Sequence, residues 1–122
     1  MMTTTNNDTM DRSEMLVLVY DRLVLDVECG LDAQRRGDRE ETVSHLTHAR
    51  DIVRELQRSI RVEEHRGGYD LAALHEFLDR RVVMATIGLG TAVTDDCLRL
   101  VTDVCLGWRE IVQSASADRL TA

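Results

Sequence analysis

The side chains of this sequence that could bind a metal ion are its histidines, cysteines and acidic residues. Helical bundles hold paired metals with Glu-x-x-His pairs on two helices, but no glutamate here precedes a histidine by three positions. His45, His48 and Asp51 are each one helical turn apart and could chelate an ion on one helix face. Because Val43, Leu46 and Val53 define the core stripe, the histidines lie beside or outside it. We therefore expect no metal and no cofactor.

Three cysteines, Cys29, Cys97 and Cys105, lack CxxC spacing and occur among apolar neighbours. Buried cysteine acts as a small hydrophobe, and free thiols suit a reducing cytoplasm. The N-terminus has neither a basic region nor an apolar stretch of the kind found in signal peptides. The sequence assembles no Ser/His/Asp or Cys/His grouping, so we expect a cytoplasmic protein that has no catalytic residues and is not an enzyme.

The charge of the chain argues against nucleic acid as a partner. Acidic residues outnumber basic ones by 22 to 15, all basic residues are arginine, and the net charge is −7. The arginine pairs Arg35-Arg36 and Arg80-Arg81 are flanked by acids, whereas binding a polyphosphate requires a concentrated basic face. The apolar run from Met15 to Leu25 is shorter than the roughly 20 residues that span a membrane. We expect contact with neither nucleic acid nor membrane.

These side chains must be positioned by helices, because the 122 residues include no proline and the apolar residues recur at spacings of three and four. Gly37, Gly67-Gly68 and Gly88 to Gly90 mark the turns, with Asp38 and Thr94 as helix N-caps. The expected helices run from about Asp11 to Arg36, from Asp38 to near His65, from Tyr69 or Asp70 to Leu89, and from Thr94 to Ser114. The sequence predicts an all-α, antiparallel up-down-up-down four-helix bundle.

Three parts of the chain are expected on this basis. Residues 1–10 are polar and form a flexible arm, residues 11–113 form the bundle, and residues 114–122 form a frayed tail or a short extra C-terminal turn. At this length a single domain can bury its own core.

The first and third helices carry more apolar residues than one core stripe needs. On the first helix Leu16, Val19 or Tyr20, and Leu23 suffice, yet four more lie beside them: Val17, Leu18, Val24 and Leu25. The third helix adds Phe77, Val83, Met84 and Ile87. A second apolar band must be covered by another element, a second copy of the chain or a partner.

Five ordered motifs span the region from about Ser13 to Ile111. They are Leu16-Val-Leu-Val-Tyr-Asp21, Ala49-Arg-Asp-Ile-Val-Arg-Glu-Leu56 with Ser59, Gly67-Gly68, Leu71-x-x-Leu74-x-x-Phe77-x-x-Arg80-Arg81-x-x-x-Ala85, and Leu106-Gly-Trp108-Arg-Glu-Ile111. In this order they resemble the flagellar secretion chaperone family FliS. The resemblance implies a non-enzymatic, cytoplasmic four-helix chaperone. Such a protein binds the C-terminal helical segment of flagellin, prevents premature polymerisation and aids delivery to the flagellar type III export gate.

The chain departs from the family pattern at several positions. Ser13 is followed by Glu14 where members commonly have Ser-Pro, no aromatic residue precedes it, and Leu74-His75 stands where the family has Leu-Tyr. From the surplus bands and the resemblance, we predict a partner-binding surface on the first and third helices, made by Val17, Leu18, Tyr20, Val24, Leu25, Phe77, Arg81, Met84 and Ile87. The predicted partners are the C-terminal region of flagellin and the cytoplasmic domain of the export gate. The alternative is a self-associating structural bundle whose second band is a homodimer interface.

Overall fold

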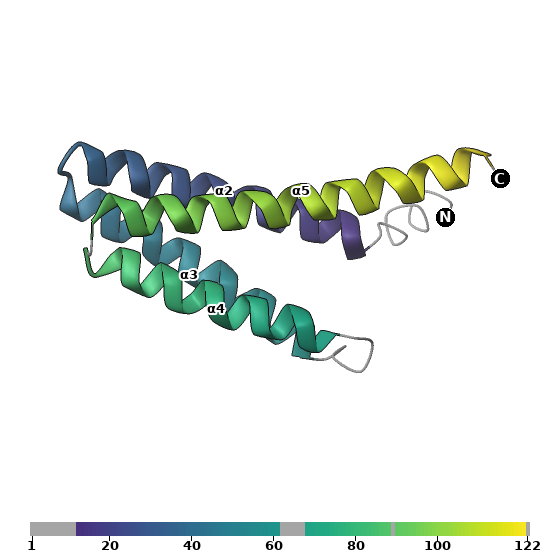
Figure 1. The fold of residues 1–122 in the computed structure, drawn as a ribbon, viewed down its shortest axis with the longest axis horizontal. Helices are drawn as coiled ribbons and strands as arrows, with labels where there is room; N and C mark the ends of the chain where they lie inside the picture. The colour runs from purple at the N-terminus through teal and green to yellow at the C-terminus, as the bar shows by residue number, and fades with distance from the viewer. Residues whose placement is uncertain (1–11, 62–67, 89, 122) are drawn as a thin grey trace, which may run out of the picture.

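Four antiparallel helices make up the bundle in the computed structural model, which describes residues 12–61, 68–88 and 90–121. They are α2 (Arg12–Arg35), α3 (Arg39–Arg61), α4 (Gly68–Thr86) and α5 (Thr91–Thr121). Each helix packs against the next, and α5 returns to pack along α2. The predicted all-α, four-helix bundle is confirmed. Figure 1 shows α2 with α5 above α3 with α4, and α4 diverging from α5 away from the turn that joins them. No helix in the described ranges is long and apolar enough to cross a membrane.

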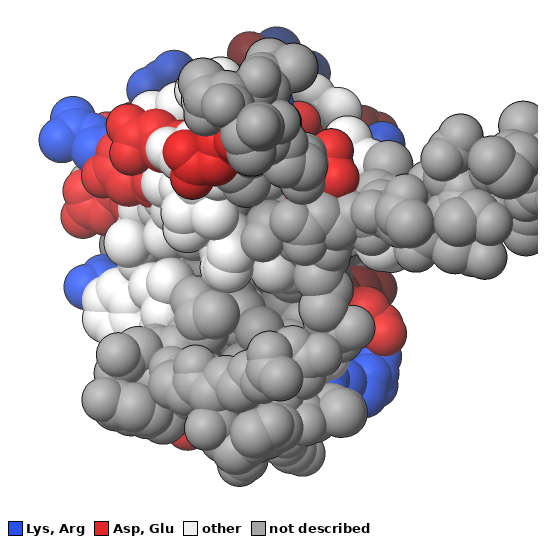
Figure 2. Space-filling model, turned by 90° about the vertical axis from the view of Figure 1, so that its right-hand side faces the viewer, with Lys and Arg blue, Asp and Glu red and all other residues white. Residues whose placement is uncertain are grey.

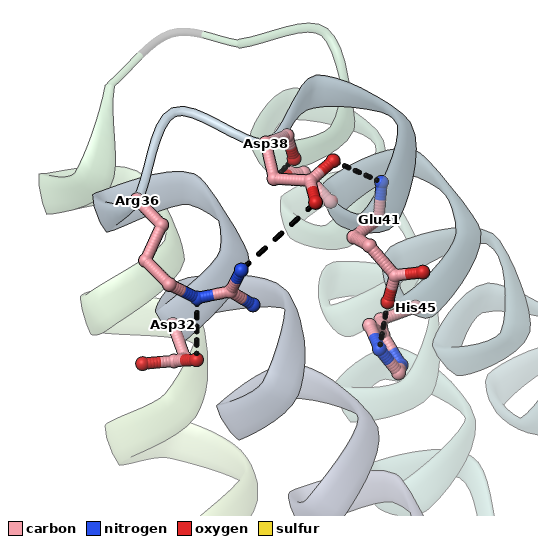
Figure 3. Close-up of polar contacts among 6 residues, drawn as sticks. Asp32, Arg36, Asp38, Glu41 and His45 are labelled. Atoms are coloured by element: carbon pink, nitrogen blue, oxygen red, sulfur yellow. Dashed lines mark hydrogen bonds and ion pairs between the residues drawn. The ribbon is translucent and has the colours of Figure 1, made fainter.

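The connection between α2 and α3 follows the predicted cap chemistry (Figure 3). Gly37 has a positive φ of 77°, which a residue without a Cβ adopts at little cost. The Asp38 N–H donates to the Ala33 carbonyl at 2.9 Å, and Asp38 Oδ1 accepts the Glu41 N–H at 3.0 Å. Because the Asp38 N–H is already bonded to α2, the Glu41 carboxylate pairs with His45 at 3.2 Å instead. The Asp38 side chain therefore caps α3, but the Glu41 side chain does not return a bond to the Asp38 N–H.

The core fills the space between all four helices. Its buried side chains recur mostly at spacings of three and four, which places them on the inner faces of the helices. They include Leu23 and Val27 of α2, Leu46, Ala49, Val53 and Leu56 of α3, Leu78, Val82 and Ala85 of α4, and Cys97, Val101 and Cys105 of α5. Around this core lies a layer of half-buried apolar side chains that includes Leu16, Val24, Leu74, Val104 and Trp108.

Helix ends differ from the sequence-based prediction where glycine sets the turn. The third helix ends at Thr86, earlier than the predicted Leu89, because Gly88 and Gly90 adopt φ values of 82° and 107°. The predicted end of the second helix near His65 and the predicted arm over residues 1–10 lie outside the described residues.

The fourth helix is longer than predicted at both ends. It begins at Thr91 and continues to Thr121, so the predicted end near Ser114 is wrong. Thr94, the predicted N-cap, is instead a buried helical residue whose Oγ1 donates to Gln34 Oε1 of α2 at 2.6 Å. The last turns consist mainly of small and polar residues, which are compatible with an exposed helix, and Figure 1 shows them projecting beyond the start of α2.

Candidate partner-binding surface

The structure divides the nine predicted surface residues by burial. Five are exposed by between 37% and 60%, namely Leu18, Leu25, Phe77, Met84 and Ile87. Arg81 and Val24 are half-buried, and Val24 packs against the core. Val17 and Tyr20 are buried. The exposed residues agree with the predicted apolar surplus. Val17 and Val24, which were expected to lie uncovered, are buried and half-buried, and Tyr20, a candidate for the core stripe, is buried.

Val17 is buried because α5 covers the beginning of α2. Asp21 of α2 is contacted by Cys105 at 3.2 Å and by the guanidinium of Arg109. Since the two helices are antiparallel, Val17 lies one turn earlier on α2 and meets the following turn of α5. The antiparallel return of α5 along α2 therefore covers a residue that the spacing along α2 leaves exposed.

Tyr20 crosses the interior and joins three helices. Its hydroxyl forms a hydrogen bond with Nε2 of His75 on α4, and its ring stacks on Trp108 of α5 with centroids 6.5 Å apart. Tyrosine can be fully buried when its hydroxyl finds such a partner. Burial raises the pKa of Tyr20 to about 12, so it stays protonated. Trp108 is a half-buried side chain at this junction.

His75 is the interior residue that sequence reasoning missed. It is fully buried, and its Nδ1 has no hydrogen-bond partner in the described part of the chain. Burial lowers its pKa from 6.5 to about 4, because the charged imidazolium is poorly solvated there. Its place three residues before Leu78 and seven before Val82, which is helical spacing, and the tyrosine found there in the family, were the available signals.

Polar side chains tie three of the four neighbouring helix pairs together. Asp26 of α2, which is buried, pairs with His48 of α3. Arg50 of α3 bonds to Asp79 of α4 at 3.1 Å. The pair α2 and α5 is joined through Asp21. Within residues 12–61, 68–88 and 90–121, no comparable hydrogen bond or ion pair links α4 to α5, so this pair is held by apolar packing.

Phe77, Arg81 and Met84 lie at spacings of four and three on α4, on the side away from Asp79, which pairs with Arg50 of α3. The positive charge of Arg81 acts on the Cys97 thiol of α5, while Asp79 points the other way, toward α3. On α5, Val104, Trp108 and Ile111 recur at the same spacings, and Trp108 also stacks on Tyr20 of α2. We call these six residues the α4–α5 face.

Viewed from the end where α5 terminates, acidic side chains with basic ones beside them gather at the upper left, and a patch of uncharged side chains lies below them (Figure 2). Phe77, Met84 and Ile111 of the α4–α5 face are exposed by 42%, 37% and 52%. These exposed apolar side chains belong to α4 and α5, the two helices that diverge in Figure 1.

The other exposed residues lie elsewhere. Leu18 and Leu25, seven residues apart, form what we call the outer face of α2, since the opposite side of this helix carries Tyr20, Leu23 and Val27. Ile87 lies in the turn after α4. The structure therefore separates the predicted surface into two faces and one turn residue.

The residues considered for metal binding have other partners. His45 pairs with Glu41 of its own helix and His48 with Asp26 of α2, so their side chains do not converge. Across the described ranges, no three His, Cys, Asp or Glu residues are arranged to hold a metal ion. Burial raises the pKa of Cys97 to about 11, which keeps this thiol protonated.

The protein is an all-α four-helix bundle whose described residues leave apolar side chains exposed on several helices. A family model described as "Flagellar protein FliS" matches residues 2–115. The chain is similar to "Flagellar secretion chaperone FliS" of Bacillus subtilis (strain 168), with 25% identity over 116 residues that cover 92% of this chain and 84% of that protein. The chain belongs to the FliS family of flagellar proteins, which confirms the resemblance read from its motifs.

Proposed function

We propose that this protein is a cytoplasmic flagellar export chaperone that binds the C-terminal helical segment of flagellin. Binding would keep that segment from polymerising before export and would present it to the cytoplasmic domain of the export gate. The observation that carries the proposal is the exposed apolar surface of the α4–α5 face in a member of the FliS family. The chaperone name of the Bacillus subtilis relative supports the same role.

The chemistry of this face suits an amphipathic helix. Such a helix lays apolar residues at helical spacing into contact with a complementary apolar surface, and Phe77 and Met84, seven residues apart on α4, offer that spacing. Covering a large apolar side chain contributes about 1.5–3 kcal/mol when burial is complete. A segment that orders as it binds uses about 2–5 kcal/mol of the contact energy, so several such side chains must be covered.

A segment long enough to wrap the bundle would also reach the outer face of α2, where Leu18 and Leu25 stay exposed. We assign these two residues to the same binding surface as a second contact. The α4–α5 face is the primary contact because it combines apolar side chains from two helices.

The deciding experiment is calorimetric titration of the folded chain with a peptide from the C-terminal helical segment of its own organism's flagellin. We expect a one-to-one complex. Phe77→Ser combined with Met84→Ser should weaken binding at least tenfold and leave the thermal midpoint nearly unchanged, because both side chains are exposed. Thr47→Ala, on the exposed side of α3, is the matched control and should bind like the wild type. A folded wild-type chain that does not bind the peptide would refute the proposal.

The rival function is a structural homodimer whose interface is the same apolar surface. Light scattering with and without peptide separates the two. A monomer that converts to a one-to-one complex supports the chaperone, whereas a dimer that persists at all concentrations and excludes the peptide supports the rival.

A further inference from the structure

Arg81 is a half-buried arginine that, unlike the half-buried Arg50, has no carboxylate partner in the described part of the chain. Among arginines whose burial the structure describes, Arg50 and Arg81 are the half-buried ones. Arg50 bonds to the carboxylate of Asp79. No carboxylate in the described ranges lies at ion-pair distance from Arg81, although acidic residues outnumber basic ones in this chain. Most exposed arginines, including its neighbour Arg80, do have an acidic partner.

The contacts of Arg81 leave its hydrogen-bond donors available. Its guanidinium carbon lies over the Phe77 ring, 5.0 Å from the centroid, and its charge acts on the Cys97 thiol. A cation–π contact uses the charge of guanidinium but none of its five N–H donors. The aromatic ring therefore holds the side chain on the α4–α5 face with its donors free to bind a ligand.

We infer that Arg81 receives a carboxylate from the segment that binds the α4–α5 face, and that this pair fixes the register and direction of the segment. The inference rests on the proposed function. Guanidinium donates two parallel N–H bonds to a carboxylate, a geometry that a point charge does not reproduce. Phe77 and Met84 flank the site, and excluding water with apolar side chains strengthens such a pair.

Because the net charge of the chain is −7, Arg81 is a position at which an acidic side chain of the ligand is favoured. An acidic side chain of the ligand is repelled by the carboxylates over much of the surface and is attracted at Arg81. Charged contacts of this kind contribute to specificity and orientation as well as to affinity. The ligand expected here is an amphipathic helix with an Asp or Glu on or beside its apolar stripe.

The test is a double-mutant cycle between the chaperone and the flagellin C-terminal peptide. Arg81→Gln removes the charge and keeps an apolar stem, Arg81→Lys keeps the charge and loses the fork, and Arg80→Gln is the matched control because Arg80 pairs with Glu76 on its own helix. Each Asp or Glu of the peptide is changed in turn to Asn or Gln. Circular dichroism confirms that every variant is folded.

We expect Arg81→Gln to weaken peptide binding about fivefold to tenfold, Arg81→Lys to be intermediate, and Arg80→Gln to bind like the wild type. One acidic substitution in the peptide should weaken binding to the wild type but not to Arg81→Gln. If the wild type binds and every peptide substitution has the same effect on both proteins, the inference is wrong and the proposed function stands. If the folded wild type does not bind, the proposed function is wrong and the inference falls with it.

Discussion

His75 should make the stability of this protein depend on pH in a range where few buried groups titrate. The side chain is fully buried, bonded through Nε2 to the Tyr20 hydroxyl, and neutral at pH 7 because its pKa is lowered to about 4. In the unfolded chain the same imidazole has the ordinary value of 6.5. Between about pH 6.5 and pH 4, His75 is therefore protonated in the unfolded state and neutral in the folded state.

The direction and size of the effect follow from this difference. The stability that His75 provides is complete above pH 6.5 and is lost as the pH falls toward 4, because protons then favour the unfolded chain. One unit of pKa shift corresponds to about 1.4 kcal/mol. The free energy of unfolding should therefore fall by about 2 kcal/mol at about pH 5 and by about 3 kcal/mol once both states are protonated.

The assay is urea denaturation followed by far-UV circular dichroism at about pH 7.5 and about pH 5, on the wild type and on His75→Gln. Glutamine cannot titrate but can still accept the Tyr20 hydrogen bond, so His45, His48 and the carboxylates contribute equally to both proteins. The difference between the two pH dependences isolates His75. An NMR titration of the imidazole protons measures the folded-state pKa directly.

Equal pH dependence in the two proteins would refute the reasoning. It would mean that the folded protein lets His75 take up a proton near its ordinary pKa, and hence that the junction of Tyr20, His75 and Trp108 opens to water. A His75 imidazole resonance that titrates near pH 6.5 in the folded protein would lead to the same conclusion.

Two further predictions concern stability. Gly30→Ala should destabilise the protein by about 1–3 kcal/mol, because an added Cβ would lie 2.7 Å from the buried Leu46 side chain. Gly107→Ala should instead stabilise the protein by about 0.5–1 kcal/mol, since nothing lies within 4 Å of its Cβ position in α5. Thermal denaturation of the two variants checks the opposite signs, and equal signs would contradict this packing. Val17→Ser should cost about 2 kcal/mol and Leu25→Ser less than about 1 kcal/mol in urea denaturation, since Val17 is buried and Leu25 is 46% exposed; equal losses would place Leu25 in the core.

Much of the fold could be predicted from local signals. Helical periodicity predicts the four helices and most of the core, and Gly37 with Asp38 predicts the first turn because their conformational and hydrogen-bonding preferences act over a few residues. The end of α5 could not be predicted in this way. Its last residues have no strong stop signal, and small polar residues are compatible with both a helix and a frayed tail.

The binding surface was predicted only in part. Leu18, Leu25, Phe77, Met84 and Ile87 were placed on open surface correctly, because a helix exposes whatever its single core stripe does not include. Val17 was expected to lie uncovered and is buried, because α5 packs along α2 and the spacing along α2 does not show this. Tyr20 was one of two candidates for the core stripe, and it is buried there.

By itself the sequence determined that this is an acidic, all-α chain of the FliS family with apolar residues beyond the needs of one core, because periodicity, charge and ordered motifs are properties of neighbouring residues. The tertiary structure decided which of those residues remain uncovered, that His75 is buried in the interior, and that Arg81 has no carboxylate partner among the described residues. These features arise where helices distant in sequence meet, since the register and divergence of packed helices set burial and pairing one side chain at a time.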